Sequence, residues 1–144
     1  MTNYIIDANV LFAAIISGKE HHVAFFNRNK LYTTDFAFIE IEKYRKKILK
    51  KAKLKNQQFF DFNVRLFSQI SVIPALALSV ESLELAYDLC EGIDTKDVMY
   101  IALTIEFKDA TLITRDNVLH NKLREKGFEK IVLFQQVFDD FLAE

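Results

Sequence analysis

Several residue types that build common functional sites are scarce in this chain of 144 residues. Tryptophan is absent, and there are only one Cys, one Pro and three Gly. A single cysteine excludes an intramolecular disulfide and suits a reducing compartment. With so few glycines, the sequence contains neither a P-loop nor a dinucleotide-binding fingerprint. Disulfide-linked scaffolds and glycine-rich nucleotide sites are therefore excluded.

Long apolar runs and a large net charge are also absent. No run approaches the roughly 18 apolar residues that a membrane span needs. The opening residues MTNYIID show no basic region followed by an apolar stretch, so we expect no signal peptide, no membrane partner and a cytoplasmic location. Hydrophobic residues make up 51% and charged residues 27%, which is typical of a globular chain. The length predicts one domain over residues 1–144.

Hydrophobic patterns predict that strands and helices alternate along the chain. Short apolar or β-branched runs predict strands over residues 3–6, 31–34, 71–74, 111–114 and 131–134. Helical patterns cover residues 10–17, followed by a break at Gly18, and then 21–29, 36–53, 55–70, 80–90, 95–106, 117–127 and 135–144. This order predicts an α/β domain of three layers, α/β/α, with a central parallel sheet of about five strands. The 14 Phe residues suggest a core packed largely by phenylalanine.

The segment from Asp94 to Asp116 carries the first candidate site. Its helix begins near Asp97, and its strand ends just before Asp116. In an α/β crossover the helix runs antiparallel to the strand that it feeds, so these two acids should meet at the carboxyl edge of the sheet. That edge is where such folds bind ligands. Each acid also has a structural explanation, because Asp94 and Asp116 could cap helices and Asp97 could complement a helix dipole.

Two further acids are expected at the same edge. Asp7 closes the first strand, although it could instead cap the next helix. Glu40 follows the second strand on a mostly apolar helix face, where a lone charge needs a partner such as a metal ion. Glu42 instead faces Arg45 and Lys46, which are ready salt-bridge partners. We therefore favour Glu40 over Glu42 as a site residue.

A cluster of carboxylates without cysteine or histidine indicates a hard cation. Mg²⁺ and Mn²⁺ prefer oxygen ligands, whereas the three histidines lack the spacing of a zinc site. We expect His21, His22 and His120 to lie at the surface. Phosphodiester hydrolysis is the chemistry that suits such a site, because bound metal activates water and stabilises the leaving oxygen.

One basic stretch stands out against the nearly neutral total. Residues 43–55, KYRKKILKKAKLK, contain eight Lys or Arg and no acid, while the whole chain has a net charge of −1. The remainder of the chain therefore carries −9. This stretch could be a solvated helix face or a surface that contacts phosphates, and the sequence gives the two interpretations equal support.

Four pieces of the chain together resemble the PIN-domain family. They are IIDANVLF, FAFIEIEKYRKKI, DTKDVMYIALTIEFKDATLITRD and IVLF, and the resemblance spans essentially the whole chain. It implies a three-layer α/β/α fold and a cluster of acids that binds Mg²⁺ or Mn²⁺. Many members are ribonucleases, often the toxins of VapBC-type toxin–antitoxin pairs, and many form dimers.

The resemblance also implies roles for single residues. The four acids of the family motif, which bind metal and act in catalysis, are matched by Asp7, Glu40, Asp97 and Asp116. Asp94 fits an additional acidic, metal-binding position, while Asn9 and Thr114 fit supporting polar positions. Val118 stands where some toxins carry a further acid, which leaves the number of metal ions open.

The sequence therefore predicts a metal-dependent endoribonuclease, the toxin of a type II toxin–antitoxin pair. Its expected partners are an RNA substrate, a cognate antitoxin and a second copy of itself. Under this interpretation the RNA-contacting residues of the basic stretch are Arg45, Lys46, Lys47, Lys50 and Lys51. The alternative is a non-catalytic PIN-like module that binds RNA or protein, but the presence of all four acids argues against it. A receiver domain would need an aspartate after SVIP, where the chain has none.

Overall fold

The computed structural model describes residues 3–17 and 20–144, so Gly18, where the sequence predicts a break, lies outside the described residues. Five strands form one parallel sheet in the order β3-β2-β1-β4-β5. The strands are β1 (Asn3–Ile6), β2 (Lys30–Thr34), β3 (Ile70–Ile73), β4 (Ala110–Thr114) and β5 (Ile131–Leu133). The predicted parallel sheet of five strands is confirmed.

The pairing of β1 with β4 determines where the candidate acids lie. Ile6 pairs with Ile113 at the end of this ladder, so the next positions are Asp7 and Thr114. The chain passes from β1 to β2 on one side and from β4 to β5 on the other. The space beyond the carboxyl ends of β1 and β4 is therefore the switch point of the sheet, where open α/β folds form their binding crevice.

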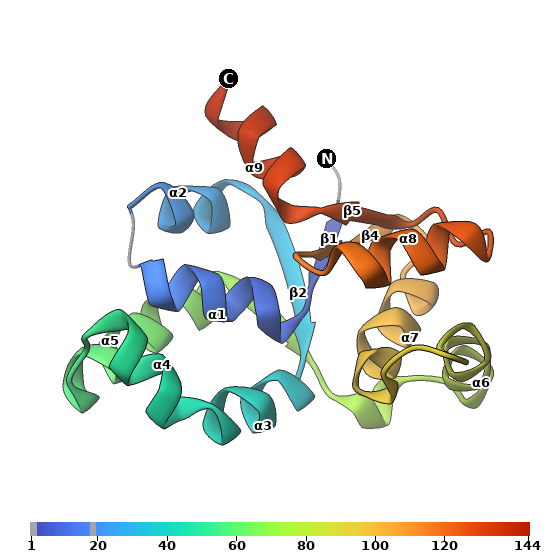
Figure 1. The fold of residues 1–144 in the computed structure, drawn as a ribbon, viewed down its shortest axis with the longest axis horizontal. Coiled ribbons are helices and arrows are strands. Elements are labelled where there is room, and N and C mark those ends of the chain that lie inside the picture. The colour runs from blue at the N-terminus through green and yellow to red at the C-terminus, as the bar shows by residue number, and fades with distance from the viewer. Residues whose placement is uncertain (1–2, 18–19) are drawn as a thin grey trace.

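Helices cover both faces of the sheet, as the sequence predicts. They are α1 (Ala8–Ser17), α2 (Glu20–Arg28), α3 (Phe36–Lys43), α4 (Arg45–Ala52), α5 (Asn56–Phe67), α6 (Val80–Leu89), α7 (Val98–Glu106), α8 (Asn117–Glu125) and α9 (Phe134–Leu142). In Figure 1, α1 to α5 lie on one side of the sheet and α6 to α8 on the other. The last helix, α9, contacts α2 and β5. Among the described residues, none of the helices is long and apolar enough to cross a bilayer.

The predicted single helix over residues 36–53 is wrong in one respect, because the structure divides it at Tyr44. The backbone there has φ −102° and ψ 10°, which ends α3 and starts α4 in a new direction. Residue periodicity continues through this point, so the local pattern alone does not reveal the break. The break lets α4 contact α1, and the side chain of Ile48 is buried there.

The core is aliphatic and not largely phenylalanine, contrary to the prediction. Its fully enclosed side chains include many Ile, Leu and Ala residues from β1, α1, α7 and β4, and only four of the 14 Phe residues are buried. The other rings line the periphery or the surface, where Phe38 and Phe60 are exposed. Aliphatic residues suit the inner layer because a parallel sheet is covered on both faces and favours branched side chains.

The expected surface position is also wrong for His22. Its ring is buried and stacks on Phe138 at 4.8 Å between centroids, and on Phe134 at 5.8 Å. The hydroxyl of Ser17 lies 2.9 Å from Nδ1 of His22. Helix α9 brings the two phenylalanines back onto α2, an arrangement that only tertiary packing can produce. His21 is exposed, and His120 is partly exposed.

The end of α8 yields a prediction on stability. Gly127 has φ +88°, and the bonds from its N–H to Arg124 and from Phe128 N–H to Leu123 close the helix in the usual two-bond arrangement. A Cβ at this position would meet no atom within 4 Å, so backbone strain alone opposes a side chain. We expect Gly127→Ala to lower the free energy of unfolding by about 1 kcal/mol. Urea denaturation checks this, with exposed Glu125→Ala as a control that should change it by less than ~0.5 kcal/mol.

Candidate functional site

Asp7 is a buried carboxylate at the end of β1, with 3% of its surface exposed. Oδ1 accepts a hydrogen bond from the N–H of Val10 at 3.0 Å, and Oδ2 accepts one from the hydroxyl of Thr114 at 2.9 Å. Burial raises the pKa of Asp7 from 3.8 to about 6, although these two hydrogen bonds lower it. The charges of Glu40 and Asp116 add to the increase. Asp7 therefore caps α1 and also lies within the electrostatic range of two other acids, Glu40 and Asp116.

Thr114 joins the two strands at the switch point. Its hydroxyl donates to Asp7 and accepts the N–H of Asp116 at 3.1 Å. The side chain is fully buried, so this bridge is shielded from water. A hydroxyl can donate one hydrogen bond while accepting others, which makes threonine suitable for linking a carboxylate to a backbone N–H. The residues following β1 and β4 are thereby brought together, as the topology predicts.

Asp116 caps α8 with only one of its two oxygens. Oδ1 accepts hydrogen bonds from the N–H groups of Val118 at 2.9 Å and Leu119 at 3.1 Å. The other oxygen accepts no hydrogen bond from any residue that the structure describes. The capping explanation for Asp116 is therefore correct, but it leaves one carboxylate oxygen for a ligand.

Asp97 is the acid for which local structure provides no partner. It precedes α7, is only 6% exposed, and makes no side-chain capping bond. Burial raises its pKa to about 7, and the charges of Asp7, Asp94 and Asp116 contribute, whereas Lys96 opposes them. Asp94 is different, because it is exposed, accepts the N–H of Lys96 at 3.1 Å and pairs with Nζ of Lys96 at 3.7 Å. The capping interpretation therefore suits Asp94 but not Asp97.

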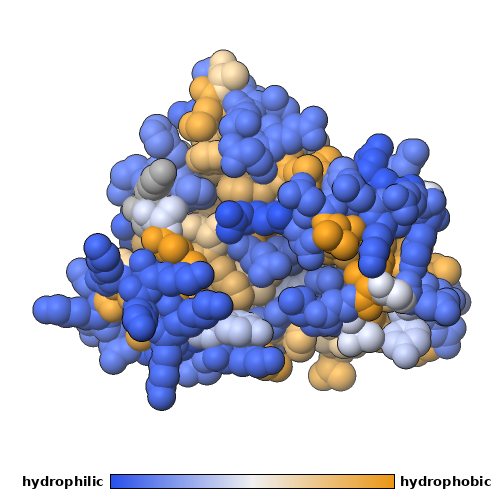
Figure 2. Space-filling view, viewed as in Figure 1, coloured by the Kyte–Doolittle hydropathy of each residue, from blue (hydrophilic) through white to orange (hydrophobic). Residues whose placement is uncertain are grey.

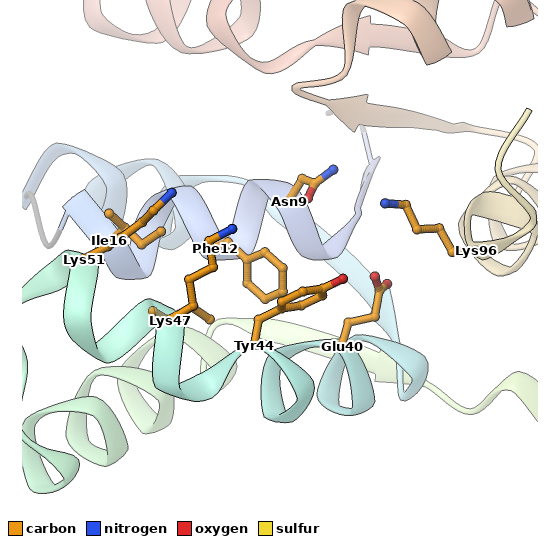
Figure 3. A pocket seen from close by; sticks show the side chains of 9 residues that line it. Asn9, Phe12, Ile16, Glu40, Tyr44, Lys47, Lys51 and Lys96 are labelled. Atoms are coloured by element: carbon orange, nitrogen blue, oxygen red, sulfur yellow. The ribbon is translucent and has the colours of Figure 1, made fainter.

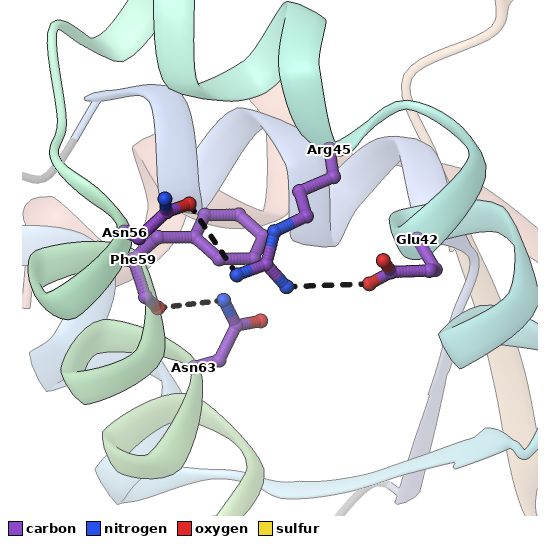
Figure 4. A network of polar contacts seen from close by, with 5 residues as sticks. All are labelled: Glu42, Arg45, Asn56, Phe59 and Asn63. Atoms are coloured by element: carbon purple, nitrogen blue, oxygen red, sulfur yellow. Dashed lines mark hydrogen bonds and ion pairs between the residues drawn. The ribbon is translucent and has the colours of Figure 1, made fainter.

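Glu40 faces the same region from α3. Its Oε1 accepts a hydrogen bond from the hydroxyl of Tyr100 on α7 at 2.8 Å. Tyr100 is buried, and burial together with the charge of Glu40 raises the pKa of Tyr100 far above its ordinary value. Two residues later, Glu42 pairs with Arg45 at 3.3 Å (Figure 4). The partner that Glu40 needs on its apolar face is thus a tyrosine hydroxyl, which the sequence did not reveal.

Two lysines of α8 and its C-terminal end hold the loop that leads to Asp94 and Asp97. Nζ of Lys126 donates to the carbonyls of Leu89 and Glu91, and Nζ of Lys122 donates to the carbonyl of Gly92 at 3.2 Å. Leu89 is the last residue of α6, and Glu91 and Gly92 follow it, so these carbonyls lie at the C-terminal end of the helix, which favours cations. The lysines therefore connect this loop to the helix that Asp116 caps.

The donors at this edge have the chemistry of a site for a hard divalent cation. Asp7, Asp97 and Asp116 offer carboxylate oxygens only, and burial together with nearby like charges raises the pKa values of Asp7 and Asp97. In the described residues, however, no three acidic, histidine or cysteine side chains already converge into a group that could hold a metal ion. The fit thus rests on the unpartnered carboxylate of Asp97 and the free oxygen of Asp116. A cation would offset charges that these side chains leave uncompensated.

The predicted basic contacts separate into two groups. Lys47 and Lys51 line a cavity of about 270 Å³ that also contains Asn9 and Glu40 (Figure 3). Arg45 faces α5 instead, where it bonds Asn56 at 3.5 Å and lies over the ring of Phe59 (Figure 4). Lys46 and Lys50 are exposed and do not line this cavity. Lys96, which sequence reasoning missed because it lies between two acids, lines the cavity as well.

The raised pKa of Asp97 leads to a prediction on stability. A group whose pKa rises from 3.8 to about 7 on folding stabilises the protein below pH 3.8, and this stabilisation is lost as pH rises through 7. Without divalent ions, Asp97→Asn should therefore stabilise the fold at pH 8 by a few kcal/mol and much less at pH 4.5. Urea denaturation in EDTA at both values measures the difference.

Asp140→Asn is the matched control, because Asp140 is an exposed aspartate on α9. It should change the free energy of unfolding little at either pH. An Asp97→Asn effect of equal size at pH 4.5 and pH 8 would contradict the assigned pKa.

Comparisons with known proteins agree with this architecture. A family model described as PIN domain matches residues 5–131. No curated protein sequence matches the chain. Among solved structures, PAE2754 from Pyrobaculum aerophilum superposes with a TM-score of 0.69 at 18% identity, covering 99% of this chain and 91% of that one.

Two VapBC structures are also similar. VapBC2 from Rickettsia felis, bound to a promoter DNA fragment, has a TM-score of 0.62 at 16% identity, covering 91% of this chain and 96% of that one. DNA-bound VapBC from Salmonella typhimurium has a TM-score of 0.63 at 15% identity, covering 92% and 97%. At these identities the likeness concerns the fold. Because the family model spans most of its length, the chain belongs to the PIN domain family.

Proposed function

We propose that this protein is a metal-dependent endoribonuclease that hydrolyses phosphodiester bonds of RNA. The observation that carries the proposal is Asp97, which is only 6% exposed and whose carboxylate makes no capping hydrogen bond. Burial, followed by the charge of Asp7, raises its pKa. Buried charges need compensation, and perturbed carboxylates at a switch point are typical of functional sites. Membership of the PIN domain family supports a nuclease.

Each acid has a separate task in this proposal. Asp7, Asp97 and Asp116 would hold Mg²⁺ or Mn²⁺, with Asp94 at the border of the site. When bound, such an ion lowers the pKa of water and stabilises the charge on the phosphate and the leaving oxygen. Asp7 is fixed in orientation because Val10 and Thr114 hold both its oxygens. Asn9, which lines the adjoining cavity, would supply a polar contact to the substrate.

Glu40 would orient the attacking water and accept its proton. The hydrogen bond from Tyr100 fixes Oε1, which leaves Oε2 to accept a proton from water. A positioned carboxylate is an ordinary general base.

Cleavage of RNA tests the proposal directly. We expect cuts in a mixed panel of single-stranded and looped RNAs with Mg²⁺ or Mn²⁺, and none in EDTA. Asp7→Asn and Asp97→Asn should each reduce the rate by roughly a hundredfold or more, because several kcal/mol of charge stabilisation depend on the ion. Asp140→Asn, on exposed α9, should cleave like the wild type.

The alternative is a non-catalytic module that binds RNA or protein. Clean folding and tight binding without cleavage by any form would favour that module and overturn the nuclease. Loss of cleavage in both aspartate variants, with folding intact by circular dichroism, would support the nuclease.

We also propose that the protein is the toxin of a type II pair, acting in the cytoplasm with an antitoxin and forming a homodimer. The supporting observation is that the similar structures include VapBC complexes from two organisms. Coexpression with the product of a neighbouring reading frame should yield a stable complex that no longer cleaves RNA. Light scattering on the isolated chain measures whether it is a dimer.

A further inference from the structure

The cavity beside Glu40 has a composition that the proposed hydrolysis leaves unexplained. It measures about 270 Å³ and lies between α1, α3 and α4. Figure 3 shows the side chains of Lys47 and Lys51 extending from α4 toward α1, while Lys96 extends toward Glu40 from the opposite side. Three lysines and a single carboxylate thus line the cavity. An excess of positive charge in a small cavity favours an anionic ligand.

Lys47 and Lys51 have no acidic partner among the described residues. The ion pairs given by the structure there are Arg45 with Glu42, Arg65 with Glu20, and Lys96 with Asp94. The two lysines are exposed and one helical turn apart, so both reach the same side of α4. In the space-filling view, hydrophilic side chains at lower left adjoin apolar surface (Figure 2). Because Lys47 and Lys51 are exposed and no described acid pairs with them, their ammonium groups are available to a phosphate.

Between these two lysines and Glu40, two aromatic rings line the cavity (Figure 3). Tyr44 and Phe12 pack edge to face, with centroids 5.7 Å apart, and 37% of Tyr44 is exposed. Nζ of Lys43 also lies over the tyrosine ring, 5.4 Å from its centroid. The break between α3 and α4 falls at Tyr44, so the ring marks the corner of the cavity. Aromatic rings beside a basic track are the arrangement by which proteins bind single-stranded nucleic acid.

We propose that this cavity is a subsite for one unpaired nucleotide of the RNA strand, with its phosphate at Lys47 and Lys51 and its base or sugar against Tyr44. The inference rests on the proposed nuclease function and extends it to substrate choice. The volume is close to the roughly 300 Å³ of small ligand sites, so the cavity admits one nucleotide but no base-paired helix. Glu40 borders both the cavity and the acids, which places the bound nucleotide next to the cleavage site.

The chain contains a matched control for this proposal. Lys46 and Lys50, which the sequence also predicted as RNA contacts, lie on the same helix, have the same spacing and are exposed. They do not line the cavity, so the subsite assigns them no contact with the nucleotide. The double variants Lys47→Ala/Lys51→Ala and Lys46→Ala/Lys50→Ala therefore remove equal charge from different sides of α4. If net charge alone determined RNA binding, the two double variants would weaken it equally.

Binding of a fluorescent single-stranded RNA of ten nucleotides, measured by anisotropy in EDTA, tests the phosphate contacts. At 0.15 M salt, Lys47→Ala/Lys51→Ala should weaken binding about tenfold and reduce the slope of log K against log salt by about 1.4, as the loss of two contacts implies. Lys46→Ala/Lys50→Ala should stay within about twofold of wild type. Equal weakening by both pairs would overturn the subsite.

Substitution of Tyr44 tests the aromatic wall. Tyr44→Leu should weaken binding about tenfold, whereas Tyr44→Phe, which keeps the ring, should bind like wild type. Tyr87→Leu removes an exposed tyrosine on α6 as a control and should have no effect. Unchanged binding by Tyr44→Leu would overturn the contact with the base or sugar.

Wild-type cleavage of the same RNA with Mn²⁺ separates the two proposals. Cleavage together with equal binding by all variants would refute the subsite and leave the nuclease standing. Absence of both binding and cleavage by the wild type would refute both.

Discussion

The rest of the site depends on the hydroxyl of Thr114, which links the residues that follow β1 and β4. It donates to Asp7 after β1 and accepts the N–H of Asp116 after β4. At this place the chain continues from β1 toward one edge of the sheet and from β4 toward the other. This bond fixes the first acid and orients the turn into α8, so that Asp116 can cap the helix with one oxygen only. Without it, Asp7 would be a buried carboxylate with one fewer donor, and burial already raises its pKa.

Around Thr114 the described part of the fold keeps several carboxylates close together without a neutralising basic group. Asp7 and Asp97 are almost completely buried, and the charge of Asp7 raises the pKa of Asp97. The donors nearby are a threonine, a tyrosine and backbone N–H groups, which orient carboxylates without neutralising them. Lys96, a basic group beside them, is paired with exposed Asp94. The burial and mutual repulsion of these carboxylates lower the stability of the fold, a cost that is common at binding sites.

Much of the architecture was predictable because it depends on local patterns and general topology. The β-branched runs predict the five strands, and the rule for crossovers places Asp7, Asp97 and Asp116 at one edge, where the structure has them. The fold prediction is confirmed, while the catalytic and metal-binding roles of these residues stay predictions. Ser79 and Gly127 also begin and end their helices as their residue types suggest.

The features that the sequence did not reveal depend on contacts between distant segments. The break at Tyr44 leaves the helical periodicity intact, and what accompanies it is the contact of α4 with α1, which lies elsewhere in the chain. The burial of His22 requires α9, more than 100 positions later in the chain. The bond from Tyr100 to Glu40 links α7 with α3, and nothing in either local pattern indicates it. Pairings of this kind follow from the assembled layers and not from any single segment.

Helix α8 has a further consequence for how the protein can vary. Its first turn is capped by Asp116, and its C-terminal end carries Lys122 and Lys126, which hold the loop before Asp94. The helix therefore fixes the distance between Asp116 at its start and the loop that leads to Asp97. One inserted residue would rotate everything after it by about 100° and turn both lysines away from the loop. The length of α8 is thus constrained by the acidic edge, although most of its side chains never touch it.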